Sequence, residues 1–214
     1  MHKDYIEQIE GAERRFFTSE VRSVKREAET EGAVIEGYAA LFNSVALIGG
    51  WFREVIMPGA FDDVLNDDVR CLFNHDPNQI LARCVNGKGT LELFVDEKGL
   101  GYRYTTPDRT YAKDLADAIE KGDVTQSSFA WKPKKTVWIE EEGLPDLRQI
   151  EKFEILYDVS PVTYPAYADT TVAKRSHDAY LAEKTRENDE QEQRSTENKG
   201  LSLTEAQLFI NQNL

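Results

Sequence analysis

The sequence has few cysteines, few histidines and a deficit of basic residues. Two cysteines and three histidines occur among 214 residues, and 26 lysines and arginines face 39 acidic residues, for a formal net charge of −13. Cys71 and Cys84 form no CxxC pair, which excludes a zinc ribbon and a disulfide scaffold. Cys71 lies in the apolar run VRCLF and is expected in the core. The acidic balance argues against a nucleic-acid partner, which would require a basic face.

A long apolar run is also missing. No segment approaches the roughly 18 consecutive apolar residues of a membrane span, and the N-terminus, MHKDYIEQIE, has no apolar stretch of the signal-peptide type. We therefore expect a soluble protein that is made in the cytoplasm and has no membrane partner.

Composition divides the chain into three parts. Residues 1–20 are polar and lack a sustained period, which predicts a flexible N-terminal arm. Residues 21–173 carry short alternating apolar runs and are expected to form one folded domain. Residues 174–214 form an acidic tail, in which Ser176–Lys199 has too few large apolar side chains to fold alone. Leu201–Leu214 begins with a capping box and predicts a short helix that docks a partner; a frayed chain end is the simpler alternative.

The central part predicts a mainly β fold with added helices (α+β). The expected strands are Val21–Glu27, Val34–Phe42, Trp51–Ile56, Val69–Phe73, Ile80–Val85, Thr90–Val95, Gly101–Thr106, Lys135–Glu140 and Leu147–Val159. Thr110–Lys121 is the clearest helix, with Asp108 as the expected N-cap and Gly122 at its C-terminal end. A second, short helix is expected at Ala60–Leu65. Many short strands with regular turns indicate a mainly antiparallel barrel or sandwich.

Ser128 is the candidate nucleophile. It lies in GDVTQSSFAW, Gly122–Trp131, where strand alternation places Ser127, Phe129 and Trp131 on one face. The aromatic side chains indicate the core face, so Ser128 is expected on the other face, among small residues that leave its hydroxyl approachable. On this pattern alone a structural serine remains the simpler interpretation, because a serine nucleophile requires a base and an orienting acid.

His75 and Asp158 are the candidate base and acid. His75 is the only histidine inside the expected domain, because His2 lies in the arm and His177 in the tail. It could equally cap a turn within FNHDPN. In Ile150–Ser160 the apolar side chains Phe153, Ile155, Tyr157 and Val159 alternate with polar ones, which places Asp158 on a polar face. A solvated carboxylate is the simpler interpretation of that pattern.

Three segments taken together resemble a known family. LFNHDPNQILAR, GDVTQSSFAW after a helix, and LYDVSPVTYPAY occur in the order and spacing of the prohead maturation proteases of tailed phages, and GYAALFNS and EVIMPGAF fit the same family. The resemblance covers about Val21 to Val172. It implies an antiparallel β-barrel of the herpesvirus-protease (assemblin-like) type, surrounded by helices.

The resemblance implies roles for individual residues. His75 matches the family's histidine, Ser128 rather than Ser127 matches its serine, and Asp158 stands where relatives often have Glu. Related herpesvirus enzymes use a second histidine as third member, and His177 could be proposed for it; we prefer Asp158. Arg83, in the ILAR segment, is a tentative oxyanion or substrate-binding residue, and an ordinary surface arginine is equally consistent.

The implied function is that of a prohead serine endopeptidase. Such an enzyme trims scaffold or capsid-protein extensions, and itself, inside the assembling prohead in the host cytoplasm. The implied partners are the major capsid protein with its scaffold region, the prohead that contains the portal, and a second copy of the chain in a homodimer. No cofactor and no metal are expected.

Two other classes of function remain. The first is a catalytically silent scaffold or virion protein on the same fold. The second is a metal hydrolase built on His75-Asp76, which is the poorer match because no second histidine stands at ligand spacing.

Overall fold

The computed structural model describes residues 11–17, 21–24, 32–164 and 174–194. The chain divides into two units, residues 1–173 and residues 174–214. Within the described residues no helix is both long and apolar enough to cross a membrane. The expected C-terminal helix at Leu201–Leu214 lies outside the described residues.

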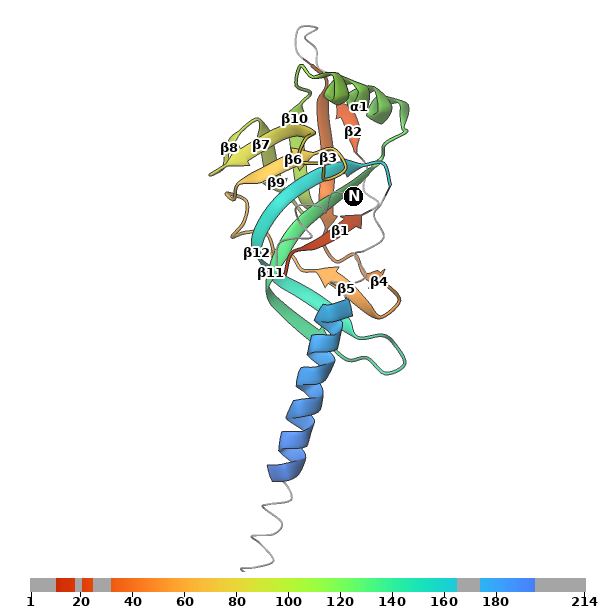
Figure 1. The fold of residues 1–214 in the computed structure, drawn as a ribbon, viewed down its shortest axis with the longest axis vertical. Coiled ribbons are helices and arrows are strands. Elements are labelled where there is room, and N and C mark those ends of the chain that lie inside the picture. Colours follow the sequence, from red (N-terminus) through yellow and green to blue (C-terminus); the bar gives the residue numbers. More distant parts are fainter. Residues whose placement is uncertain (1–10, 18–20, 25–31, 165–173, 195–214) are drawn as a thin grey trace, which may run out of the picture. The chain divides into compact units, whose positions relative to one another are not determined.

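The first unit is mainly β and contains two sheets (Figure 1). The larger sheet has the order β1-β11-β12-β6-β7-β8, and β5 joins it beside β12 and pairs with β4. The smaller sheet has the order β2-β3-β10-β9. The strands are β1 (Glu13–Phe17), β2 (Arg22–Val24), β3 (Val34–Leu41), β4 (Ala46–Ile48), β5 (Phe52–Ile56), β6 (Val69–Leu72), β7 (Ile80–Val85), β8 (Lys88–Gly89), β9 (Leu91–Val95), β10 (Gly99–Thr105), β11 (Gln126–Ile139) and β12 (Leu147–Val162).

This architecture confirms the expected mainly β fold with an added helix. It departs from the expected antiparallel β-barrel in the direction of some strands. Most strand pairs are antiparallel, but β12 runs parallel to both β5 and β6. The pairs among the described strands form two separate sheets, so the closed barrel stays a prediction. The segment expected as a strand at Lys135–Glu140 is the second half of β11, which continues to Ile139.

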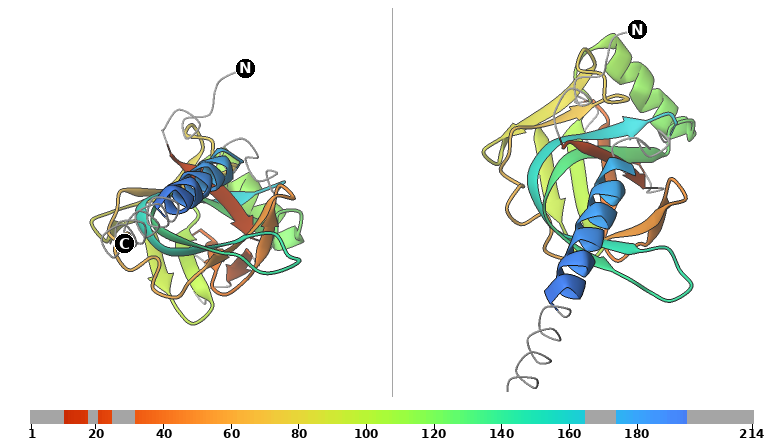
Figure 2. Two further views of the ribbon diagram at one scale, coloured as in Figure 1. Left: turned by 90° about the horizontal axis from the view of Figure 1, so that it is seen from below. Right: turned by 60° about the horizontal axis from the view of Figure 1, so that its bottom comes forward.

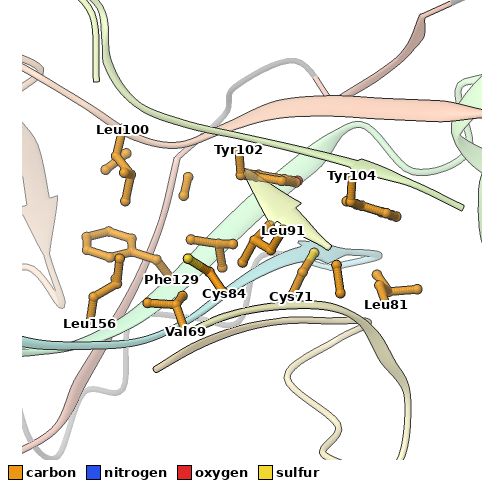
Figure 3. Close-up of a cluster of buried hydrophobic side chains, with 14 of the residues drawn as sticks. Val69, Cys71, Leu81, Cys84, Leu91, Leu100, Tyr102, Tyr104, Phe129 and Leu156 are labelled. Carbon is orange, nitrogen blue, oxygen red and sulfur yellow. The ribbon is translucent and has the colours of Figure 1, made fainter. Parts of the chain in front are cut away.

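The core lies between the two sheets. Leu91, Leu100, Tyr102 and Tyr104 come from the smaller sheet, and they meet side chains of β6, β7, β11 and β12 (Figure 3). Cys71 is fully buried in this cluster, as expected, and both cysteines are free. Burial of these apolar side chains is the main stabilising term, at roughly 25 cal/mol for each Å² removed from water.

Two long strands organise the larger sheet. β11 and β12 pair along almost their whole length, and register shifts interrupt the pairing at several points. Ala130 of β11 pairs with Asp158 of β12, whereas the next residue, Trp131, pairs with Leu156. Tyr157 is therefore an extra residue on β12, which forms a β-bulge there. Because of this bulge the core receives Leu156, not Ile155 and Tyr157 as simple alternation predicts.

The helix α1 (Thr110–Lys121) has the predicted bounds and lies at one end of the strands (Figure 1). It buries Ala112, Leu115 and Ile119. Gly122 follows it with a left-handed φ of 81°, the conformation for which glycine is favoured after a helix. The expected N-cap is wrong: the N-cap is Arg109, and Asp108 forms an ion pair with Lys113 instead.

Three further expectations are corrected. Residues 58–66 form consecutive turns rather than a helix, with hydrogen bonds between residues three apart, such as Val64 N–H to the Phe61 carbonyl. The expected flexible arm contains β1, which pairs with β11. The acidic tail is helical over residues 174–194, because its Glu, Lys, Arg and Ala residues have high intrinsic helix propensity even where little surface is buried.

Candidate active site

Three neighbouring strands of the larger sheet position the candidate residues. Ser128 lies on β11, where it pairs with Ser160 of β12, and Ala130 pairs with Asp158. Paired residues of antiparallel strands point to the same face, so Ser128 and Asp158 share one face of the sheet. On the other side of β12 lies β6, paired at Asp158 with Arg70. The chain leaves β6 and reaches His75 three residues later.

The loop after β6 holds His75 in an unusual backbone conformation. Asn74 and His75 have φ values of 55° and 58°, in the left-handed region that costs non-glycine residues about 1 kcal/mol or more each. Several hydrogen bonds offset this cost. Asn74 N–H donates to the Pro161 carbonyl at 3.1 Å, and the Asn74 side-chain oxygen accepts from Thr163 N–H at 2.9 Å. The loop is thereby fixed to the end of β12, next to Asp158.

His75 contacts both other candidates. Its Nε2 lies 2.7 Å from Ser128 Oγ, and its Nδ1 lies 2.6 Å from Asp158 Oδ1. With Asp158 ionised, Nδ1–H donates to the carboxylate, which leaves the Nε2 lone pair facing the serine hydroxyl. Ser160 Oγ–H donates to the same Asp158 oxygen at 2.9 Å and holds the carboxylate in place.

The neighbouring serine faces the other way. Ser127 is fully buried on the core side, and its hydroxyl lies 2.8 Å from that of Tyr102. Burial raises the pKa of the Tyr102 phenol well above its usual value, so it stays neutral. Gly37 leaves room for this ring, because a Cβ there would lie 2.9 Å from the phenol oxygen. Alternation thus assigns the two serines to opposite faces, as the sequence predicts.

Ser128 is less accessible than its small neighbours suggest. Its side chain is 1% exposed, and His75 and Asp158 are 6% and 2% exposed. β1 lies next to this group: it pairs with β11 at Phe16–Ser128 and runs beside it in the views of Figures 1 and 2. Ser128 Oγ–H also lies in donor geometry to the Arg15 carbonyl at 2.9 Å. The expectation of an approachable hydroxyl is therefore wrong for this arrangement.

Arg83 does not join the group. Its guanidinium forms two hydrogen bonds of 2.7 Å with Asp68, and both side chains are more than two-fifths exposed. This ion pair raises the pKa of Arg83 and lowers that of Asp68. The geometry gives the tentative oxyanion role no support. His177 lies in the second unit, and His2 lies outside the described residues.

Sequence reasoning missed β1 altogether. The side chains of Glu13 and Arg15 are 3% exposed, and their partners Glu54 and Arg148 lie on β5 and β12. Charged residues normally predict solvent-exposed side chains, and partners so far apart along the chain produce no local sequence pattern. Among the described residues, no group of three or more His, Cys, Asp or Glu side chains could hold a metal ion.

The arrangement of hydroxyl, imidazole and carboxylate is the one that serine hydrolases use on many unrelated folds. The chain belongs to the caudovirus prohead serine protease family, whose model matches residues 18–183. It is therefore a serine endopeptidase of capsid maturation, which associates with prohead components and acts in the assembling phage prohead within the host cell.

Comparison with solved structures finds the capsid assembly protease gp21 of bacteriophage T4. The two chains are 15% identical with a TM-score of 0.41, over 70% of this chain and 98% of the other. Comparison with curated protein sequences finds no match.

Proposed function

We propose that Ser128, His75 and Asp158 are the catalytic residues of this endopeptidase, as nucleophile, general base and orienting acid. The observation that supports this assignment is the pair of short contacts at the imidazole, 2.7 Å to Ser128 Oγ and 2.6 Å to Asp158 Oδ1. A serine hydroxyl is nearly inert at neutral pH, and an imidazole with a fixed tautomer makes it reactive.

The reaction is acyl transfer. Ser128 Oγ adds to the carbonyl carbon of the scissile peptide bond while His75 Nε2 takes the hydroxyl proton. The imidazolium is stabilised by Asp158, and it donates the proton to the leaving amine as the C–N bond breaks. Water then enters, His75 takes one of its protons, and the ester with Ser128 is hydrolysed. Ser160 contributes by holding the carboxylate that orients the ring.

We propose as substrates the scaffold region or extension of the major capsid protein, and the chain itself. The site of action would be the prohead that contains the portal, and the active form would be a homodimer. Family membership supports this function over a silent structural protein, since the matched region contains all three proposed catalytic residues. The assemblin-like barrel remains part of this proposal.

Co-expression with the major capsid protein of the same phage tests the proposal. Intact-mass measurement should show trimming of the capsid protein and of the protease, and Ser128→Ala should abolish both. Ser127→Ala is the matched control: it removes the same atom one residue away, from a hydroxyl bonded to Tyr102, and should preserve trimming. Trimming that survives Ser128→Ala, or that requires Ser127 instead, would refute the assignment.

A further inference from the structure

The strand β1 lies where a peptide substrate would bind. It is the edge strand of the larger sheet and pairs antiparallel with β11, the strand that carries Ser128. Its backbone is extended, and its Arg15 carbonyl lies 2.9 Å from the Ser128 hydroxyl. Peptides commonly bind to proteins as an added edge strand, with affinity from the backbone and specificity from alternate side chains. β1 has this geometry relative to the proposed nucleophile.

The side chain of Arg15 occupies a site suited to arginine. Its Nε and Nη2 lie 2.6 Å and 3.1 Å from the two carboxylate oxygens of Glu54. Its guanidinium carbon lies 5.6 Å from the centre of the Trp131 ring. A two-point contact with a carboxylate and an aromatic face are features that select arginine over other side chains. Glu54 and Trp131 are both buried, so water competes little for these contacts.

Glu13, two residues earlier and on the same side of β1, meets Arg148. Arg148 Nη2 and Nη1 donate to the two Glu13 oxygens at 2.8 Å and 2.9 Å. Although burial alone would raise it, the two arginines Arg15 and Arg148 lower the pKa of Glu13 below its usual value. Glu13 is therefore ionised at neutral pH, and β1 presents one negative and one positive side chain to the interior.

The charges balance whether or not β1 is bound. Arg148 Nη1 also donates to Glu54 at 3.1 Å, so these two residues pair with each other directly. β1 adds a neutral pair, Glu13 and Arg15, to the neutral pair Glu54 and Arg148. An isolated buried charge is very unfavourable, but the departure of β1 would leave none behind. A strand with this charge pattern can therefore be exchanged for another with the same pattern.

We propose that the edge of β11 is the substrate-binding edge, and that it recognises peptides of the pattern Glu-x-Arg. Glu54 and Trp131 select arginine at the residue whose carbonyl meets Ser128, and Arg148 selects glutamate two residues before it. Residues 13–17, ERRFF, are the chain's own copy of this pattern and occupy the site. The inference rests on the proposed function, since it takes Ser128 as the nucleophile.

Two consequences follow from this assignment. Because β1 occupies the edge of β11 beside Ser128, it excludes other peptides from this edge and inhibits the enzyme until it is displaced. In a bound substrate, Ser128 Oγ bonds to the arginine carbonyl carbon. The amine of the next residue leaves with the proton that His75 carries, and water hydrolyses the ester. Cleavage therefore follows the arginine.

Peptide binding tests the recognition without requiring catalysis. The full chain with Ser128→Ala is titrated with a fluorescent peptide, GAERRFFTS, which copies residues 11–19. Replacement of the arginine that corresponds to Arg15 by leucine should weaken binding at least about tenfold, because a carboxylate-bound guanidinium is lost. The same replacement at the position of Arg14, the matched control, should weaken it less than about threefold, because that side chain lies on the other face of β1. Equal effects of the two changes would overturn the proposal.

A second pair of variants tests the inhibition by β1. The double variant Glu13→Ala/Arg15→Ala removes one charge of each sign from β1 and keeps the interior neutral. It should bind the added peptide at least about tenfold more tightly than the chain with Arg14→Ala, because the tethered competitor is weakened. With Ser128 present, it should also cleave the peptide faster than the Arg14→Ala chain. No gain in either measurement would overturn the proposal.

The outcomes separate the inference from the proposed function. If cleavage of an unfolded test protein depends on Ser128 but shows no preference for Glu-x-Arg, the inference fails and the proposed function stands. If the chain cleaves nothing in a Ser128-dependent way, the proposed function fails, and the peptide titration still decides whether this edge recognises the pattern.

Discussion

The substitution Asp158→Asn keeps the imidazole ring of His75 but changes the group that orients it. The change keeps the size of the side chain but replaces an acceptor oxygen, 2.6 Å from His75 Nδ1, with either an amide NH₂ or a neutral carbonyl. If the NH₂ group faces the ring, Nδ1 must accept and the proton moves to Nε2, which then cannot take the Ser128 proton. If the carbonyl faces the ring, the imidazolium loses its stabilising charge.

The expected loss in kcat is about 10⁴-fold, the size found when the orienting carboxylate of such a site becomes an amide. This corresponds to about 5 kcal/mol of transition-state stabilisation. The Ser160→Ala variant provides a graded comparison. It removes one hydrogen bond of 2.9 Å to the same carboxylate oxygen and leaves the charge, so a loss of about tenfold is expected.

The assay is hydrolysis of a fluorogenic peptide by purified full-length chains, followed over a range of pH. Thermal unfolding of each variant checks that the fold is intact. Raising the pH should not restore the activity of the Asp158→Asn chain. An Asp158→Asn chain that is folded and retains activity within about tenfold of wild type would refute the role of Asp158.

Three further predictions concern Arg83, Glu13 and Gly122. Arg83→Ala should change the rate of peptide hydrolysis by less than about threefold, because Arg83 binds Asp68 in an exposed ion pair; a loss of ~100-fold would restore it as an oxyanion donor. Glu13 has a lowered pKa, so its ion pairs stabilise the fold above its ordinary pKa near 4.5 and this contribution is lost as pH falls below it. In urea titrations, the free energy of unfolding of Glu13→Gln should therefore lie furthest below that of the wild type at pH 6 to 7. This difference should become smaller toward pH 3, and a difference that does not change with pH would contradict the prediction. Gly122→Ala should lower the free energy of unfolding by about 1 kcal/mol, because φ is 81° and no atom lies within 4 Å of an added Cβ; an unchanged urea midpoint would show that the left-handed conformation carries no cost.

The local patterns of the sequence predict much of the fold. The helix at Thr110–Lys121 has an apolar stripe and a terminal glycine, and its bounds agree with the structure. Most strands of the central part lie within a few residues of their predicted positions, because alternation reflects which face is buried. The sequence predicts a short helix at Ala60–Leu65, where the structure has turns, because a short apolar run is compatible with both.

The candidate site could be predicted in part. Alternation separated Ser128 from Ser127 correctly, because no bulge interrupts β11 between Ser127 and Phe129. Alternation failed earlier on β12, where the extra residue Tyr157 shifts the pattern. Asp158 was still assigned to the correct face, since it lies after that bulge with Val159 and Ser160. That His75 meets both residues depends on a loop in left-handed conformation, which no periodicity describes.

The role of β1 could not be predicted from local sequence. Its buried side chains are charged, and they become compatible with the interior only through partners on strands 39 to 135 residues away. The helix at residues 174–194 escaped prediction for a different reason. Low apolar content predicts a segment that does not fold alone, but a helix needs no core when its residues favour the helical conformation.

The most direct test of the central claim, that His75 activates Ser128, is covalent labelling with a small fluorophosphonate that reacts with activated serines. Labelled full-length protein is digested, and the modified residue is located by fragmentation mass spectrometry, which distinguishes Ser128 from Ser127. The account predicts a single adduct on Ser128 that disappears in His75→Ala and persists in Ser127→Ala. An adduct on Ser127 or elsewhere, or labelling of Ser128 that does not depend on His75, would contradict it.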